Sequence, residues 1–98
     1  MNLTNSYPSL VDTVVLITGG ATGIGAGLVE AFCQQRARVV FVDILQNEAE
    51  RLVEKIAAIE GAVAPVFFQC DLLDIAALQS VIARIRNELG PIAVLINN

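Results

Sequence analysis

The stretch Thr18-Gly19-Gly20-Ala21-Thr22-Gly23-Ile24-Gly25 decides how this sequence folds, because it joins a strand pattern to a helix pattern. The β-branched run 13–18 leads into it, and helical periodicity starts within it at Gly23 and continues to about Arg36. A glycine-rich turn from a strand to a helix lets the backbone approach a pyrophosphate, and the helix start supplies free N–H groups and a positive dipole end. The stretch therefore predicts a dinucleotide-binding turn.

Within this turn each glycine has its own expected task. We expect Gly19 to make the tight turn, Gly23 to leave room for the phosphates, and Gly25 to let the helix pack closely on the strand. Thr22 and Ile24 stand between these glycines and complete the predicted cofactor contacts of the loop. A glycine turn that serves only tight packing is the alternative.

The residues around the glycines do not match two other nucleotide-binding loops. The P-loop of a nucleoside triphosphatase needs Lys and then Ser or Thr after its last glycine, whereas Ala26-Gly27 follows here. A methyltransferase loop would have an acidic residue leading into the glycines, where this chain has Leu16-Ile17-Thr18.

Strand and helix patterns keep alternating along the rest of the chain. A helix N-capped by Asn47 should end at a left-handed cap at Gly61, and a helix capped by Asp74 should end at Gly90-Pro91. Further strands are expected at 38–42, 64–69 and 92–97. The apolar positions that recur along the expected helices are Ile24, Leu28, Ala31 and Phe32, then Ala49, Leu52, Val53 and Ile56, then Ile75, Leu78, Ile82, Ile85 and Leu89.

This alternation predicts an α/β fold, a Rossmann-type doubly wound parallel sheet with strand order 3-2-1-4. Right-handed crossovers should place the first two helices on one face of the sheet and the third helix on the other. The second face then has a single helix, and the last strand is a free apolar edge that invites association. We therefore interpret the sheet as incomplete.

Acidic residues follow two of the expected strands. The carboxyl ends of parallel strands form the edge at which such sheets bind ligands. Asp43 follows Gly25 by 18 positions, close to the spacing at which a carboxylate accepts hydrogen bonds from the ribose hydroxyls of a dinucleotide. The same carboxylate would repel a 2′-phosphate, and neither Thr22 nor Ile44 supplies a cation to offset it. The predicted cofactor is therefore NAD rather than NADP.

Two further strand ends carry polar residues. Asp71 follows the third expected strand and can meet the amino group of an adenine, although Asp also favours turns of this kind. The side-chain amides of Asn97 and Asn98, at the end of the last strand, can hold the loops of the sheet or touch the ribose.

Composition excludes several classes of function. With 55% apolar and 16% charged residues the chain is not of a disordered type, and a net charge of −4 with scattered basic residues argues against nucleic-acid binding. No apolar run approaches the length of a membrane span, and Met1–Asn5 lacks a secretory signal pattern. The chain has no histidine, and Cys33 and Cys70 have neither disulfide nor metal spacing, so we expect a cytoplasmic protein without a metal site.

Together these motifs resemble the short-chain dehydrogenase/reductase family. Its cofactor loop, Thr-Gly-x-x-x-Gly-x-Gly, matches Thr18 to Gly25, and its acidic residue after the second strand matches Asp43. Its Asp and neighbouring apolar residue after the third strand match Asp71 and Leu72, and its Asn-Asn-Ala-Gly motif matches as far as Asn97-Asn98. The resemblance implies a homo-oligomeric enzyme that transfers a hydride between nicotinamide and an alcohol or carbonyl substrate.

The family's catalytic Tyr, its Lys four residues later and its Ser have no counterpart in this sequence. The single tyrosine is Tyr7, and Val11 stands four residues after it. We therefore expect residues 1–98 to be the cofactor-binding, N-terminal part of one dinucleotide-binding domain and to be inactive alone, with the catalytic part missing from this chain. The alternative is a non-catalytic nucleotide-binding or interaction module.

Overall fold

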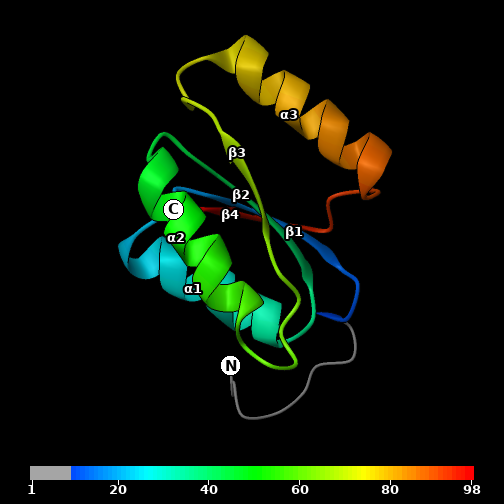
Figure 1. Ribbon diagram of the computed structural model, residues 1–98. Helices are drawn as coiled ribbons and strands as arrows, with labels where there is room; N and C mark the ends of the chain where they lie inside the picture. Colours follow the sequence, from blue (N-terminus) through cyan, green and yellow to red (C-terminus); the bar gives the residue numbers. More distant parts are fainter. Residues whose placement is uncertain (1–9) are drawn as a thin grey trace.

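The fold is known from a computed structural model that describes residues 10–98. Tyr7 and the segment Met1–Asn5, in which we expect no secretory signal, lie outside the described residues. Strands and helices alternate along the chain (Figure 1), in the order β1 (Val14–Thr18), α1 (Gly23–Gln34), β2 (Arg38–Asp43), α2 (Gln46–Ala57), β3 (Val66–Gln69), α3 (Ile75–Glu88) and β4 (Val94–Asn97).

The four strands form one parallel sheet in the order β3-β2-β1-β4. This confirms the predicted Rossmann-type order, with the reversal between β1 and β4. Thr18 at the end of β1 is level with Val42 on β2 and Asn97 on β4, so the carboxyl ends of neighbouring strands reach one edge together. Every residue of β1 is buried, which explains why its sequence is a continuous apolar run rather than an alternating one.

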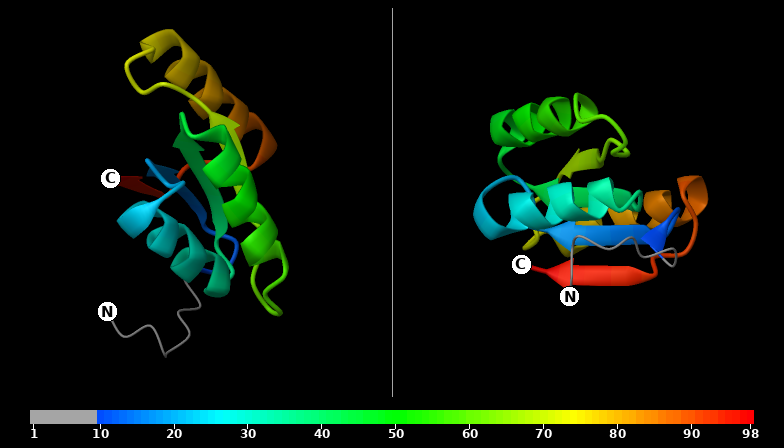
Figure 2. Two further views of the ribbon diagram at one scale, coloured as in Figure 1. Left: turned by 60° about the vertical axis from the view of Figure 1, so that its left-hand side comes forward. Right: turned by 90° about the horizontal axis from the view of Figure 1, so that it is seen from below.

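The helices divide between the two faces of the sheet as predicted. Side chains of β1 and β2 such as Ile17 and Phe41 form a core with α1 and α2, which lie side by side. The alternate side chains, including Leu16 and Val40, pack against Ile85 of α3, which lies apart from the other two helices (Figure 2). Within residues 10–98, α3 is the one helix on this face, and Leu95 of the edge strand β4 stays 61% exposed.

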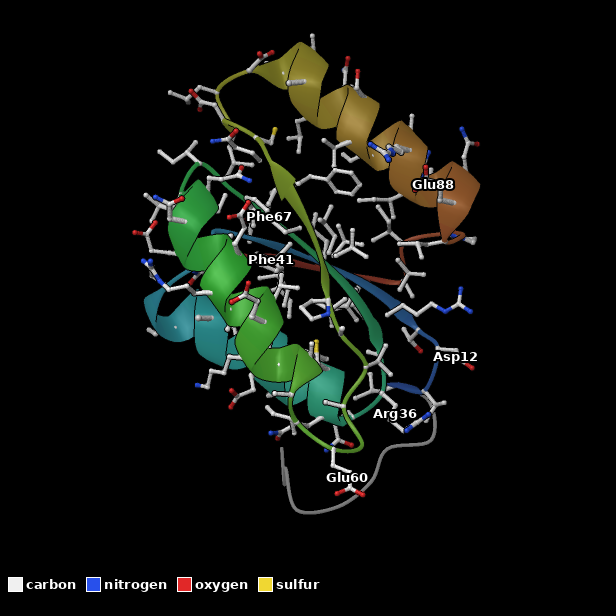
Figure 3. The ribbon with its side chains drawn as sticks, viewed as in Figure 1. Asp12, Arg36, Phe41, Glu60, Phe67 and Glu88 are labelled. Carbon is white, nitrogen blue, oxygen red and sulfur yellow. The ribbon has the colours of Figure 1, made fainter. Side chains whose placement is uncertain are left out.

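The outer strand β3 is attached through aromatic packing. Phe67 on β3 is in register with Phe41 on β2 (Figure 3). The centroids of their rings lie 5.1 Å apart, and the ring planes make an angle of 38°. Such tilted pairs add to the area that the two rings bury. β3 begins at Val66, two residues later than expected, because Pro65 has no N–H with which to extend the ladder.

The inward face of α1 was predicted in part, since Leu28 and Phe32 pack against the core as expected. The buried positions are Gly25, Val29 and Cys33, whereas Ile24 is 79% exposed. Because Gly25 has no Cβ, the helix start comes so close to the β1 end that this glycine, and not its larger neighbour, takes the inner position. The helix ends at Gln34, earlier than the expected Arg36.

The expected limits of α2 were wrong at both ends. The helix begins at Gln46 with Leu45 as N-cap, so Asn47 lies inside its first turn. The reason is that the Asp43 carboxylate accepts the Leu45 N–H at 3.1 Å and turns the chain two residues earlier. The helix ends at Ala57, and Gly61, although left-handed at φ +85°, belongs to the turn that follows.

The N-cap of α3 was predicted correctly, since Asp74 Oδ1 accepts the Ala77 N–H at 3.0 Å. Its apolar stripe was correct from Leu78 onward, but Ile75 is 67% exposed because it lies at the helix start, beyond the edge of the sheet. β4 begins at Val94, two residues later than expected.

A strained residue closes the C-terminal end of α1. Arg36 is left-handed at φ +66°, its N–H donates to Cys33 O at 3.0 Å, and the Ala37 N–H donates to Phe32 O at 3.1 Å. These two bonds define a Schellman motif, whose left-handed position is usually glycine. Asp12, also left-handed at φ +62°, donates its N–H to Arg36 O, and the two residues lie at the same end of the molecule in Figure 3.

The change Arg36→Gly should therefore raise the free energy of unfolding by about 0.5–1 kcal/mol. Glycine removes a left-handed strain of about 1–2 kcal/mol but adds about 0.5–1 kcal/mol of unfolded-chain entropy. Urea unfolding followed by circular dichroism measures the change. Arg36→Ala, which removes the same side chain and keeps the strain, is the control, and equal stability of the two variants would contradict the prediction.

Candidate functional site

The turn between β1 and α1 lies at the carboxyl edge of the sheet. Gly19 at φ +67° and Gly23 at φ +59° are both left-handed, as the sharp change from strand to helix requires. A Cβ on Gly25 would overlap the Gly19 carbonyl oxygen, whereas a Cβ on Gly23 would meet nothing within 4 Å. The turn is therefore closed on its inner side at Gly25 and open to solvent at Gly23.

The end of β4 holds this turn from one side. The Thr18 hydroxyl donates to Asn97 Oδ1 at 2.8 Å and accepts the Asn98 N–H at 3.1 Å. The Asn98 amide Nδ2 donates to Gly19 O at 2.9 Å. Of the two expectations for these amides, the structure shows the one in which they hold a loop. The sequence placed Thr18 in the cofactor-loop motif but predicted no task for its hydroxyl, although a buried hydroxyl in an apolar strand needs partners of this kind.

Asp43, at the end of β2, holds the turn from the other side. Its Oδ2 accepts the Ala21 N–H at 3.1 Å, and its Oδ1 accepts the Leu45 N–H at 3.1 Å. An ionised carboxylate has about four acceptor positions, so each oxygen can still accept a hydroxyl of a ligand. The two backbone partners were invisible in the sequence, because any residue type supplies an N–H.

Five of the predicted residues line one hollow of about 190 Å³ at the carboxyl edge. Asp43 and Asp71 bring carboxylates to it, and the Oδ1 of Asp71 also accepts the Leu73 N–H at 2.9 Å, so the turn-forming role expected of Asp71 is present. The complete lining is Gly19, Asp43, Ile44, Cys70, Asp71 and Leu72.

Cys70 is the member of this lining that the sequence did not suggest. Burial raises the pKa of its thiol, and Asp74 and Asp71 raise it further. Burial, with a smaller contribution from Glu30, also raises the pKa of Cys33 in α1 from 9.0 to about 12. Both thiols are therefore neutral near pH 7, and Cys70 contributes a small apolar wall rather than a nucleophile.

The other five predicted residues lie outside the hollow, namely Thr22, Gly23, Ile24, Gly25 and Asn97. Thr22 is the extended N-cap of α1 and makes no side-chain cap hydrogen bond, and Ile24 projects from the first turn. This first turn has no acidic residue, so its N–H groups and dipole remain available to an anion. Asn97 instead borders a second, larger cavity of about 540 Å³ between β1, β4 and α3, which Leu72 also reaches.

Residues 10–98 were also searched for two other kinds of site. They contain no group of three or more His, Cys, Asp or Glu side chains placed to hold a metal ion. None of the helices in this range has the length and apolar character needed to cross a bilayer.

Comparisons with known proteins agree on one family. The family model described as short chain dehydrogenase matches residues 13–98. The chain is 47% identical over 94 residues to a "Probable galactose dehydrogenase" of Rhizobium meliloti, covering 96% of this chain and 36% of the relative. It is 41% identical over 92 residues to a D-xylose 1-dehydrogenase of Caulobacter vibrioides, covering 94% and 35%.

A solved structure supports the same grouping. A crystallised short chain dehydrogenase from Bacillus anthracis superposes with a TM-score of 0.79 at 32% identity, over 89% of this chain and 35% of that one. The chain thus spans about a third of the length of the proteins it matches.

Replacing Thr18 with Val should lower the free energy of unfolding by about 1–3 kcal/mol, because the isosteric side chain leaves Asn97 Oδ1 and the Asn98 N–H without their partner. Urea unfolding measures the loss. Thr22→Val is the matched control, since this exposed hydroxyl makes no cap hydrogen bond and its loss should change stability by less than about 0.5 kcal/mol. Equal effects of the two changes would remove Thr18 from the role of anchor.

Proposed function

The chain belongs to the short-chain dehydrogenase family, and from this premise we propose that it is the NAD-binding portion of an oxidoreductase. The parent enzyme would transfer a hydride between a nicotinamide cofactor and an alcohol or carbonyl substrate. The observation that carries the proposal is the single hollow that brings Asp43 and Asp71 beside the left-handed Gly19 at the carboxyl edge of the sheet.

The residues present fit such a cofactor. The open space at Gly23 and the uncapped start of α1 suit a pyrophosphate, which needs backbone N–H groups and no side chain in its way. Asp43 would accept the ribose hydroxyls and Asp71 the adenine amino group. The remaining predicted contacts are Gly19, Thr22, Ile24, Gly25, Ile44, Leu72 and Asn97. When bound, the nicotinamide supplies the hydride acceptor or donor.

The charge of the hollow favours NAD over NADP. Its lining includes two carboxylates, and within the described part of the chain it includes no Lys or Arg. A 2′-phosphate would stand against Asp43 without a cation to neutralise it, and such like-charge contacts are unfavourable at short range.

We propose that residues 1–98 form the N-terminal part of a single dinucleotide-binding domain, and that the catalytic groups belong to the rest of a longer parent. Two observations support this division. The relatives are about three times longer than the matched region, and the only tyrosine is Tyr7, with no lysine four residues after it. On this proposal the 98-residue chain alone has no dehydrogenase activity.

We also propose that the parent enzyme is a cytoplasmic homo-oligomer that binds neither nucleic acid nor a membrane. Cys33 and Cys70 are buried and free, as is usual in the reducing cytoplasm. The apolar edge at β4, with its exposed Leu95, invites the 98-residue chain to associate with copies of itself. For the parent, a homo-oligomer is what membership of the family implies. The net charge of −4 gives neither nucleic acid nor an anionic membrane surface an electrostatic footprint.

The substrate class we propose is an aldose oxidised at C1. Both relatives named above are sugar dehydrogenases by their descriptions, and they are 47% and 41% identical to this chain. Oxidation of the ring hydroxyl at C1 to a lactone removes one hydride and one proton, which is the hydride transfer proposed for the parent.

Isothermal titration calorimetry of the chain should show weak binding of NAD and weaker binding of NADP. Asp43→Ala should weaken NAD binding by about 10- to 100-fold and reduce the discrimination against NADP, since a hydrogen bond to a charged group contributes about 1.5–3 kcal/mol. Glu60→Ala removes an exposed carboxylate at the opposite end of the molecule (Figure 3) and is the control. An unchanged ratio of NAD to NADP affinity in the Asp43 variant would refute the assigned role.

The substrate class is tested on the longer parent protein by the rate of NADH formation. D-galactose or D-xylose should give a kcat/KM on the order of 10⁴ times that of cyclohexanol, because a site built to hydrogen-bond sugar hydroxyls rejects an analogue that lacks them. Comparable values for the two kinds of alcohol would rule out a sugar substrate and leave the oxidoreductase proposal standing.

A further inference from the structure

The Asp43 carboxylate accepts a hydrogen bond from the β1–α1 turn, whose Ala21 N–H lies 3.1 Å from Asp43 Oδ2. We propose that Asp43 is a positioning residue, whose carboxylate holds the β1–α1 turn in the conformation described above. This inference rests on the proposed function and deepens it, because it gives one carboxylate two tasks. The first task is to shape the turn, and the second is to recognise the ribose.

Three consecutive residues of the turn lie against the end of β2. The Gly19 N–H donates to Val42 O at 2.8 Å. Gly20 lies so close to Phe41 that a Cβ would stand 2.7 Å from the Phe41 Cβ. The Ala21 N–H then donates to Asp43 Oδ2 at 3.1 Å. This last bond is the one in the series that depends on a side chain, and α1 starts two residues beyond it.

The carboxylate is itself held by rigid parts of the fold. The Asp43 carbonyl accepts the Cys70 N–H at 3.1 Å, which ties the residue to the end of β3. Its second carboxylate oxygen accepts the N–H of Leu45, the N-cap of α2. One side chain therefore links the starts of α1 and α2, and the position of the turn is set by the sheet rather than by the turn alone.

This arrangement would couple recognition of the ribose to the shape of the turn at the pyrophosphate position. The Ala21 N–H, which sets the turn around the pyrophosphate position, and the ribose hydroxyls would share the same carboxylate. A ligand group that displaced Asp43 from Ala21, as a 2′-phosphate would, also releases the turn. Discrimination against such a ligand would then exceed the effect of charge repulsion by itself.

Hydrogen exchange of backbone amides, measured by NMR on the 98-residue chain without cofactor, tests the inference. The readout is the exchange rate of the Ala21 amide divided by that of the Gly19 amide, whose acceptor is Val42 O. A general loss of stability changes both rates and cancels in this ratio. Asp43→Ala should raise the ratio by about tenfold or more, because a hydrogen bond to a charged acceptor is lost. Asp71→Ala, which removes the other carboxylate of the hollow, should leave the ratio unchanged.

Either of two results would overturn the inference: an unchanged ratio in Asp43→Ala, or an equal rise in Asp71→Ala. If Asp43→Ala does not fold, Asp43→Asn decides, since its neutral oxygen is a weaker acceptor and should raise the ratio a few-fold. No rise in that variant would overturn the inference as well. Because no cofactor is present, the outcome is independent of the NAD titration, and each proposal can fail without the other.

Discussion

The fold depends on one close approach, that of α1 to the end of β1. A side chain on Gly25 would overlap the Gly19 carbonyl, so the helix could not start where it does. That start determines which residues of α1 face the sheet, and Val29 and Cys33 follow Gly25 into the core. The same approach presents the first N–H groups of the helix at the carboxyl edge, so packing and the proposed ligand recognition depend on the same missing Cβ.

The architecture was predictable because it follows from burial. Runs of buried β-branched residues indicate a parallel sheet, and the right-handedness of crossovers then leaves little choice of topology. The element limits were less predictable because they depend on single side chains far from the helices they affect. The start of α2 is set by the hydrogen bond that the Leu45 N–H donates to the Asp43 carboxylate. This bond outweighs the preference of Asn47 for the N-cap position. The exposure of Ile24 likewise follows from its neighbour Gly25.

The candidate site was likewise predictable only in part. Asp43 and Asp71 were found from their positions after strands, since strand ends in a parallel sheet meet at one edge whatever the loops do. The bonds that shape the turn were not found, because their donors are backbone N–H groups such as that of Ala21. The hydroxyl of Thr18 was also missed. It belongs to a strand that reads as apolar, and only the register with Asn97 shows why it is there.

The groups proposed to recognise the cofactor occur at the start of α1 or within three residues of a strand end, so the rigid sheet largely places them. The face that α3 covers alone keeps a cavity of about 540 Å³, and that cavity reaches Thr18 and Asn97 at the edge of the site. A group packed in this cavity would contact Thr18 and Asn97, which anchor the β1–α1 turn. Burial of the second face and the shape of the turn are therefore linked through Thr18.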